Sequence, residues 1–263
     1  MRALLALGVS IFVAGLALGQ PALSDADIEQ FLLNAKVLKT RSAGKGLTNT
    51  LRATLTDGTL THDVHIQTID ERKVRAETKQ GVELNFRDSW KFNVAAYRLD
   101  RMLGLNMVPV SVPRRHGRDD ASFTWWIPDV LVDEEDRLKR KLTAPDPTRW
   151  KQQMDLLRVF DQLIYNNDRN LGNVLITQDW RVWLIDHSRA FRLHKELKSA
   201  RNIATCDRQV LDGMKQLTKD ALTRELTGFL TEPEIDALLA RRDLIVAQLE
   251  RAPERTLFER TLP

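Results

Sequence analysis

The stretch "YNNDRNLGNVLI", residues 165–176, sets polar side chains between two apolar runs. The first run ends at Ile164, and the second begins at Val174. Amides and a carboxylate packed this closely are costly to bury unless each finds a hydrogen-bonding partner or a metal ion. The stretch therefore indicates a loop held by two core segments, with polar side chains available for a ligand.

A β-hairpin is predicted directly after this loop. Its expected parts are a strand at 174–176, a turn at Gln178–Asp179 and a strand at 182–185. An antiparallel pair returns the chain to the end at which it started, so we expect Asn173 and Asp186 to lie at the same end of the hairpin. Asp168, five positions before Asn173, is expected close by.

Carboxylate and amide oxygens that converge in this way suit Mg²⁺ or Mn²⁺ carrying phosphate groups. In phosphotransferases one Asp orients the attacking hydroxyl, while an Asn and a second Asp hold the metal ions that bridge the nucleotide phosphates. This pattern predicts Asp168 as the catalytic residue and Asn173 and Asp186 as metal ligands, with ATP as co-substrate.

The segments "DRNLGN" (168–173) and "WLIDHSRAF" (183–191) together resemble the catalytic core of the phosphatidylinositol 3/4-kinases. They are more similar to the secreted atypical kinases of the Golgi casein kinase and four-jointed type, as is "NVAAYRLDRMLGLNMVPV" (93–110). The resemblance implies a bilobal α+β fold, with a small β-rich N-lobe and a larger, mainly helical C-lobe. It also implies transfer of the γ-phosphoryl of a nucleoside triphosphate to a hydroxyl group.

The order of predicted elements agrees with that architecture. A capped helix begins near Ser24, and a second helix follows Ser89 and stops at Gly104. Extended runs are expected at 37–43, 49–56, 60–69, 108–112 and 122–127. The last helix begins at Thr231, in a capping box with Glu234. We predict an N-lobe over 24–142 and a C-lobe over 143–263, divided at the proline-rich "TAPDPTRW".

A small glycine-rich loop between the first two strands, Gly44-Lys45-Gly46, is predicted to cover the phosphates of the nucleotide. The resemblance implies a lysine on the third strand and a glutamate on the following helix. Gln67 and Asn93 stand at those positions, so both charges are replaced by amides that can still hydrogen-bond. Residues His65 and Gln67 are expected on the same face of the strand.

Two functional alternatives follow from this replacement. The chain is an active kinase in which Lys45, or less favourably Lys73, supplies the missing positive charge. Otherwise it is a non-catalytic pseudokinase or a module that binds a nucleotide or another phosphorylated ligand. The presence of Asp168, Asn173 and Asp186 together favours the first alternative, because each is costly to keep in a purely structural role.

Arginines accompany the motif. Arg169 follows the catalytic Asp and is a candidate contact for phosphate or for a neighbouring backbone carbonyl. Arg189 and Arg192 are candidates for holding an acidic substrate, or they solvate a surface. His187 stands where the related motif has Phe, and we expect it to replace that residue in packing.

The chain has 263 residues, 43% of them hydrophobic, and a net charge of +4, which does not indicate a nucleic-acid binder. Residues 1–19 read as a signal peptide, which predicts a secreted or periplasmic protein; the alternative is a membrane anchor formed by residues 3–18. Cys206 is the single cysteine, so no intramolecular disulfide forms. The hydroxyl acceptor (protein, glycan or lipid) and the oligomeric state are not predicted.

Overall fold

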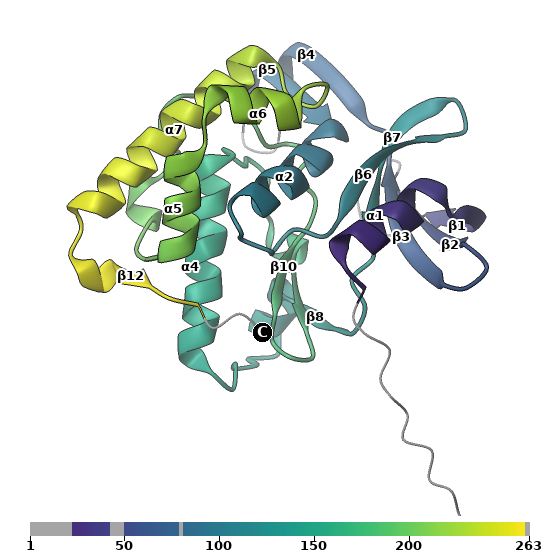
Figure 1. The fold of residues 1–263 in the computed structure, drawn as a ribbon, viewed down its shortest axis with the longest axis horizontal. Coiled ribbons are helices and arrows are strands. Elements are labelled where there is room, and N and C mark those ends of the chain that lie inside the picture. The colour runs from purple at the N-terminus through teal and green to yellow at the C-terminus, as the bar shows by residue number, and fades with distance from the viewer. Residues whose placement is uncertain (1–22, 43–49, 79–80, 261–263) are drawn as a thin grey trace, which may run out of the picture.

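The computed structural model describes residues 23–42, 50–78 and 81–260 (Figure 1). The predicted signal peptide and the Gly44–Gly46 loop lie outside the described residues. Among the described helices, none combines the length and the apolar composition that a membrane crossing requires.

The N-terminal part is built around a five-stranded antiparallel sheet in the order β1-β2-β3-β7-β6. Its strands are β1 (Lys36–Ser42), β2 (Leu51–Thr56), β3 (Thr61–Gln67), β6 (Ser111–His116) and β7 (Asp119–Trp125). Helix α1 (Asp25–Asn34) precedes the sheet, and Ser24 caps it in a capping box with Asp27. Asp57 closes the β2–β3 turn, since its Oδ1 accepts from the backbone N–H of Thr59 at 2.8 Å and of Leu60 at 2.7 Å.

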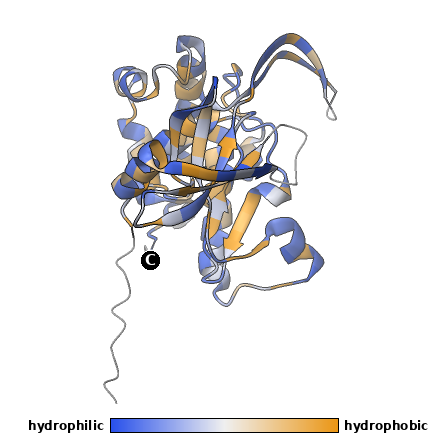
Figure 2. Ribbon diagram, turned by 90° about the vertical axis from the view of Figure 1, so that its right-hand side faces the viewer, coloured by the Kyte–Doolittle hydropathy of each residue, from blue (hydrophilic) through white to orange (hydrophobic). Residues whose placement is uncertain are grey.

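A separate two-stranded ribbon, β4 (Asp70–Thr78) and β5 (Gly81–Ser89), projects from the body (Figures 1 and 2). The sequence pattern did not predict it, because most of β4 is exposed on both faces and therefore lacks apolar alternation. Helix α2 (Lys91–Met102) follows at once and is largely buried, in agreement with the predicted second helix.

The three-stranded sheet of the second half has the order β10-β9-β8. Strands β9 (Val174–Thr177) and β10 (Val182–Leu184) form the predicted hairpin, and β8 (Val130–Asp133) pairs with β9. This pairing joins residues on the two sides of the predicted boundary at 142/143. Between β8 and β9 the chain forms α3 (Glu134–Lys139), α4 (Pro147–Leu163) and the 3-10 turn η1 (Leu171–Asn173).

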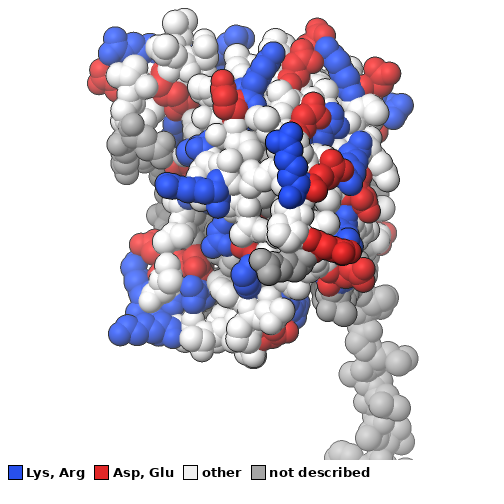
Figure 3. Space-filling view, turned by 90° about the vertical axis from the view of Figure 1, so that its left-hand side faces the viewer, with Lys and Arg blue, Asp and Glu red and all other residues white. Residues whose placement is uncertain are grey.

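Helices dominate the rest of the chain, which confirms the predicted α+β class with its β-rich and helical parts. They are η2 (Ala200–Asn202), α5 (Arg208–Gln216), α6 (Lys219–Leu226), α7 (Glu232–Arg251) and η3 (Glu254–Thr256), with a short parallel pair of β11 (Cys206–Asp207) and β12 (Leu257–Phe258). The capping box of Thr231 and Glu234 starts α7 as expected. On the face near α5 and α7, acidic and basic side chains are intermingled (Figure 3).

One continuous hydrophobic cluster runs through both parts of the fold. At its centre Phe92 of α2 lies 5.5 Å, ring centre to ring centre, from Phe191 of the segment after β10. Arg241 of α7 is fully buried and donates to the carbonyl oxygens of Leu163 at 2.8 Å and of Arg192 at 3.0 Å. The end of α4 and the segment after β10 are thereby fixed to one another, and the loop at 165–173 lies between them in sequence.

Candidate active site

The end of the β9–β10 hairpin brings the predicted metal ligands together at the level of the backbone. Val174 pairs with Leu184, and the N–H of Ile185 donates to the carbonyl oxygen of Asn173 at 3.1 Å. Asn173 and Asp186 therefore flank the same end of the hairpin, as the spacing predicted.

Arg169 links this end of the hairpin to helix α4 through hydrogen bonds. Its Nη1 donates to the carbonyl oxygens of Asn173 at 3.0 Å and of Ile185 at 2.7 Å. Its Nε donates to Asp161 Oδ2 at 3.0 Å, and both side chains are only 11% exposed. Of the two roles considered for Arg169, the geometry favours the contact with backbone carbonyls over a contact with phosphate.

His187 completes the contacts of Arg169. Its Nε2 lies 3.0 Å from Arg169 Nη2. Because a guanidinium can only donate, Nε2 must accept, and the imidazole is neutral. Burial, together with the Arg169 charge, holds the pKa of His187 well below its usual value. The ring meets Phe160 edge to face at 6.1 Å, which fits the expected packing role.

Gln67 of β3 and Asn93 of α2 form the hydrogen bond that replaces the expected ion pair. Asn93 Nδ2 donates to Gln67 Oε1 at 2.5 Å, and Asn93 Oδ1 accepts from the backbone N–H of His187 at 2.8 Å. The two amides are 1% and 6% exposed. The pair is therefore neutral, buried and linked directly to the residue that follows Asp186.

Asp186 is held in an uncommon backbone conformation. Its φ of 53° lies in the left-handed region, which costs a residue with a Cβ about 1–2 kcal/mol. The residues on both sides are fixed: Arg169 binds the carbonyl of Ile185, and Asn93 binds the N–H of His187. The exposed carboxylate accepts from Ser188 Oγ at 3.0 Å. Aspartate adopts this conformation more readily than most residues, and the exposed Asp129 shares it with a φ of 55°. What distinguishes Asp186 is that the backbone groups on both of its sides are held by side chains from other elements.

Asp168 is presented to solvent by the loop. Its backbone N–H donates to Asn166 Oδ1 at 3.0 Å, and Asn166 in turn donates to Asp161 at 3.2 Å. The Asp168 side chain is 43% exposed, and its Oδ2 lies 3.5 Å from Arg189 Nη1. The carboxylate is thus accessible to an incoming hydroxyl, while the backbone beneath it is fixed.

Two further titratable groups lie near Asp186 that the sequence pattern did not single out for this role. Asp88, at the end of β5, is buried, and its pKa is raised by burial, with the charge of Asp186 adding to the rise. A hydrogen bond from the N–H of Ser89 to the carbonyl of Ser188, at 2.8 Å, holds this end of β5 beside the site. Burial lowers the pKa of His65, and the carboxylate of Asp186 opposes that shift.

Asp88 was missed because it belongs to the unpredicted ribbon. A single carboxylate just before a helix has the ordinary interpretation of a helix-capping residue. Its approach to Asp186 depends on the ribbon folding back onto the segment after β10, and no local pattern records that contact.

The oxygen donors present are compatible with a divalent cation. Mg²⁺ is usually held by one or two carboxylates together with substrate phosphates and water, so Asp186 and Asn173 form an adequate protein share. Within the described residues, no group of three or more His, Cys, Asp or Glu side chains is arranged around a common point. A cation here would therefore depend on phosphate oxygens for much of its coordination.

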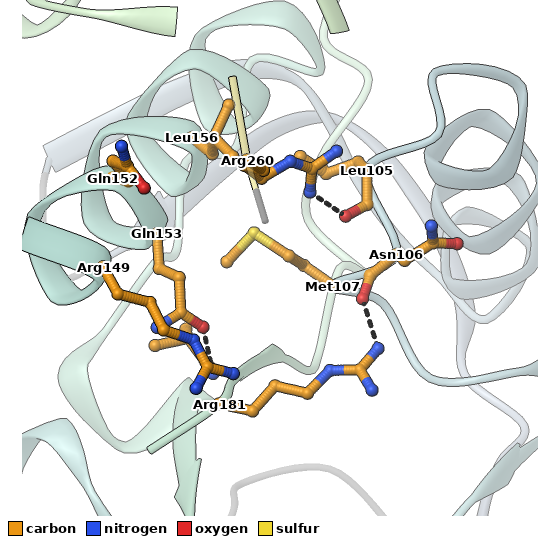
Figure 4. A pocket seen from close by; sticks show the side chains of 10 residues that line it. Leu105, Asn106, Met107, Arg149, Gln152, Gln153, Leu156, Arg181 and Arg260 are labelled. Atoms are coloured by element: carbon orange, nitrogen blue, oxygen red, sulfur yellow. Dashed lines mark hydrogen bonds between the residues drawn. The ribbon is translucent and has the colours of Figure 1, made fainter. Parts of the chain in front are cut away.

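Three cavities in the described part of the chain differ in their distance from the loop. The smallest, about 60 Å³, lies between α4 and residues 105–107. Figure 4 shows Arg181 and Arg260 in its wall, each donating to a backbone carbonyl. A second cavity of about 480 Å³ lies behind the loop and is lined by Asp161, Asn166 and Arg169. None of the three is lined by Asp168, Asn173 or Asp186.

The sequence matches no protein-family model and no curated protein. Solved structures do resemble the fold. Fam20 of hydra, solved with sugar, has a TM-score of 0.65 at 16% identity over 91% of this chain and 94% of its own. The Golgi casein kinase with Mn/ADP bound has a TM-score of 0.63 at 12% identity, over 90% and 80% of the two chains. A proinflammatory kinase of Helicobacter pylori, CtkA, has 0.53 at 11%, over 83% and 94%.

These likenesses confirm the predicted resemblance to atypical kinases at the level of the fold. They extend across both the β-rich part and the helical part, since each covers more than four fifths of the chain. The chain therefore has a kinase-like fold, with Asp168, Asn173 and Asp186 at the loop and hairpin on which the prediction rests.

Proposed function

We propose that this chain is an atypical kinase that transfers the γ-phosphoryl group of ATP to a hydroxyl of an acceptor. The kinase-like fold supports the reaction class. The observation that carries the proposal is the fixation of the backbone on both sides of Asp186, by Arg169 and by Asn93, which leaves its carboxylate exposed.

In this proposal each residue has one role. Asp168 orients the acceptor hydroxyl and takes its proton as the oxygen attacks phosphorus, which suits a half-exposed carboxylate on a fixed loop. Asp186 and Asn173 hold Mg²⁺ or Mn²⁺. A divalent cation bound there would neutralise charge on the nucleotide phosphates. Arg169 positions both ligands and does not contact the nucleotide.

The positive charge usually given by a lysine must come from another residue, because Gln67 and Asn93 are neutral. Lys73 is a poor source, since its Nζ lies 2.7 Å from Glu71 and 5.7 Å from the ring centre of Phe86. We propose Lys45, flanked by Gly44 and Gly46, for this role. Replacing it by Ala should abolish transfer while leaving the fold intact.

A non-catalytic function is the second candidate, and the same amide pair favours it. A buried Gln67–Asn93 hydrogen bond stabilises the contact between β3 and α2 without any nucleotide. In that case the chain is a pseudokinase, or a module that binds a nucleotide or another phosphorylated ligand.

Binding and transfer separate the two candidates. The thermal midpoint of the full chain is measured with Mn²⁺ and ATP, for the wild type, Asp186→Ala and the control Asp120→Ala, whose side chain is 73% exposed at the start of β7. We expect a metal-dependent rise that Asp186→Ala abolishes and Asp120→Ala retains. Transfer of labelled phosphate, to the chain itself or to a mixed acceptor pool, should then be lost in Asp168→Asn. Binding without transfer supports the second candidate, and no binding contradicts the first.

Export is a further proposal, based on residues 1–19. A reporter enzyme fused after residue 30 that is active only outside the cytoplasm would support it. Activity of that fusion in the cytoplasm would contradict it, and it would place the protein where ATP is abundant.

A further inference from the structure

Two arginines from the segment after β10 meet a single glutamate of the β4–β5 ribbon. Arg189 Nη2 donates to Glu83 Oε2 at 2.7 Å. Arg192 Nη2 lies 2.7 Å from the other oxygen, Oε1. The exposed fractions of the three side chains are 15% for Arg189, 6% for Arg192 and 17% for Glu83. The contact therefore removes two guanidinium groups and one carboxylate from most of the solvent.

The hydrogen bonding of this cluster is incomplete. Arg192 presents a rigid fork of five N–H donors, yet its Nε and both Nη atoms have no hydrogen-bond partner. Arg189 Nε and Glu83 Oε1 also lack one. Arg192 is thus close to the carboxylate of Glu83 without donating to it. Buried polar groups in native proteins are nearly always hydrogen-bonded, so this guanidinium, which has an ionic contact but no hydrogen bond, has donors available for a further acceptor.

The surroundings of the two arginines select an anion as that acceptor. Both guanidinium groups lie over the ring of Phe86, at 5.1 Å for Arg189 and 5.7 Å for Arg192. The acidic groups that face them are Glu83, Asp88 and, at 3.5 Å from Arg189, Asp168. Glu83 alone engages both arginines at close range, and its two oxygens cannot satisfy the two guanidinium forks together.

We propose that Arg189 and Arg192 form a binding site for a phosphate group and that Glu83 occupies this site in the free protein. A phosphate carries more negative charge than a carboxylate and has three free oxygens, so it can receive bidentate bonds from both guanidinium groups. Because Arg189 also reaches Asp168, the site adjoins the carboxylate proposed to act on the acceptor. The phosphate is either free inorganic phosphate or part of the acceptor, and the second source rests on the proposed function.

A movement of the β4–β5 ribbon would allow Glu83 to move away from Arg189 and Arg192. The base of β5 is anchored, because Arg87 contacts Glu234 at 2.5 Å and Phe86 is buried. The ribbon around Glu83 is open to solvent, since Val82 and Leu84, on either side of it, are 55% and 68% exposed and Val74 on β4 is 84% exposed. A two-stranded ribbon has little stability of its own. Displacement of Glu83 therefore requires a shift of the outer ribbon and leaves the core in place.

Binding of inorganic phosphate, without nucleotide or metal, tests the site directly. Calorimetric titration compares the wild type with Glu83→Gln, Arg192→Gln and the control Arg115→Gln, which alters an arginine that is 70% exposed on β6. We expect Glu83→Gln to bind about tenfold more tightly than the wild type, since a competing charge is removed. Arg192→Gln should lose binding, and Arg115→Gln should match the wild type.

Circular dichroism on each variant establishes that it is folded. The proposal is overturned if folded Glu83→Gln binds no phosphate, or if Arg192→Gln binds as tightly as the wild type. Since ATP is absent, a pseudokinase would still bind phosphate here. An active kinase that binds none would contradict only this site.

A competition experiment identifies the source of the phosphate. Glycerol 3-phosphate is added to Glu83→Gln saturated with inorganic phosphate, with glycerol as the control. Displacement by glycerol 3-phosphate alone assigns the site to a phosphate monoester on an acceptor. Retention of inorganic phosphate assigns it to free phosphate. In either case mutation of Arg192 should remove the bound phosphate.

Discussion

Two polar contacts involve the segment that follows Asp186, and they differ in how completely their hydrogen bonds are formed. In one, the amides of Gln67 and Asn93 bind each other, and Asn93 also binds the backbone of His187. In the other, Glu83 meets Arg189 and Arg192 with most guanidinium N–H groups unpaired. The first contact has lost its charges and kept its hydrogen bonds, as a structural contact should. The second has kept its charges without enough acceptors, which is the state expected of a ligand site between ligands.

Substitution of Arg169 should cause the largest loss in the free energy of unfolding. Arg169→Met leaves the buried carboxylate of Asp161 without its ionic partner and frees the carbonyls of Asn173 and Ile185. We expect a loss of about 3–5 kcal/mol in the free energy of unfolding, measured by denaturant titration. The control Arg140→Met, an exposed i,i+4 pair with Asp136, should change it by less than about 0.5 kcal/mol. Equal losses of stability for the two substitutions would show that Arg169 does not hold the end of the hairpin to helix α4.

Restoring the ion pair tests whether the amides are a matched replacement. Gln67→Lys or Asn93→Glu alone buries an unpaired charge and should destabilise the fold, whereas the double variant pairs the two charges. The coupling energy from a double-mutant cycle should be about 1–3 kcal/mol, favouring the double variant. Thermal or denaturant unfolding measures it. Additive effects would mean that the two positions are independent, contrary to the hydrogen bond between them.

The buried His187 makes the stability of the fold sensitive to pH. Its folded pKa is depressed, so the unfolded chain binds a proton that the folded chain does not. Its contribution to stability is therefore complete above the ordinary histidine pKa of about 6.5 and is lost as the pH falls below it. Between pH 7 and 5.5, the wild type should lose about 1 kcal/mol more than His187→Phe.

Denaturant titrations in a chelator measure this difference free of any bound metal. Asp100, whose raised pKa of about 6 acts in the opposite direction in this range, is present in both proteins and cancels. Parallel pH profiles for the wild type and His187→Phe would refute a buried neutral imidazole.

Arg192 should give the smallest change in stability, although it is as deeply buried as Asn93. Arg192→Met removes donors that make no hydrogen bond, and Glu83 keeps its hydrogen bond from Arg189, so the free energy of unfolding should change by less than about 1 kcal/mol, in either direction. Asn93→Leu provides the comparison and should cost about 1–3 kcal/mol, because it leaves Gln67 Oε1 and the His187 N–H unpaired. Denaturant titration measures both changes. A larger loss of stability for Arg192→Met than for Asn93→Leu would contradict the expected order.

Much of the candidate site was predictable because its signals are local. The five-residue spacing of Asp168 and Asn173, the turn at 178–179 and the strand before Asp186 all belong to one hairpin, where neighbours in space are neighbours in sequence. The capped starts of α1 and α7 follow from side chains within three residues of the cap. The paired change to Gln67 and Asn93 was visible as a pattern, and the structure confirms the hydrogen bond between them.

The β4–β5 ribbon was not predicted from the local sequence pattern. Strand β4 is exposed for much of its length and has no run of alternating apolar residues. Strand β5 does alternate, at Val82, Leu84 and Phe86, but this short signal was not recognised without a partner strand beside it. Glu83 and Asp88 were therefore not linked to the site, although both lie on the ribbon that folds against the segment after β10.

By itself, the sequence determined the kinase-like order of elements and the meeting of Asn173 and Asp186 at one end of a hairpin. Only the tertiary structure decided that Arg169 binds backbone carbonyls and Asp161, while Arg192 contacts Glu83 without a hydrogen bond. The physical reason is that periodicity and turn chemistry act over a few residues, whereas the partner of a long charged side chain depends on which distant segment the fold places beside it.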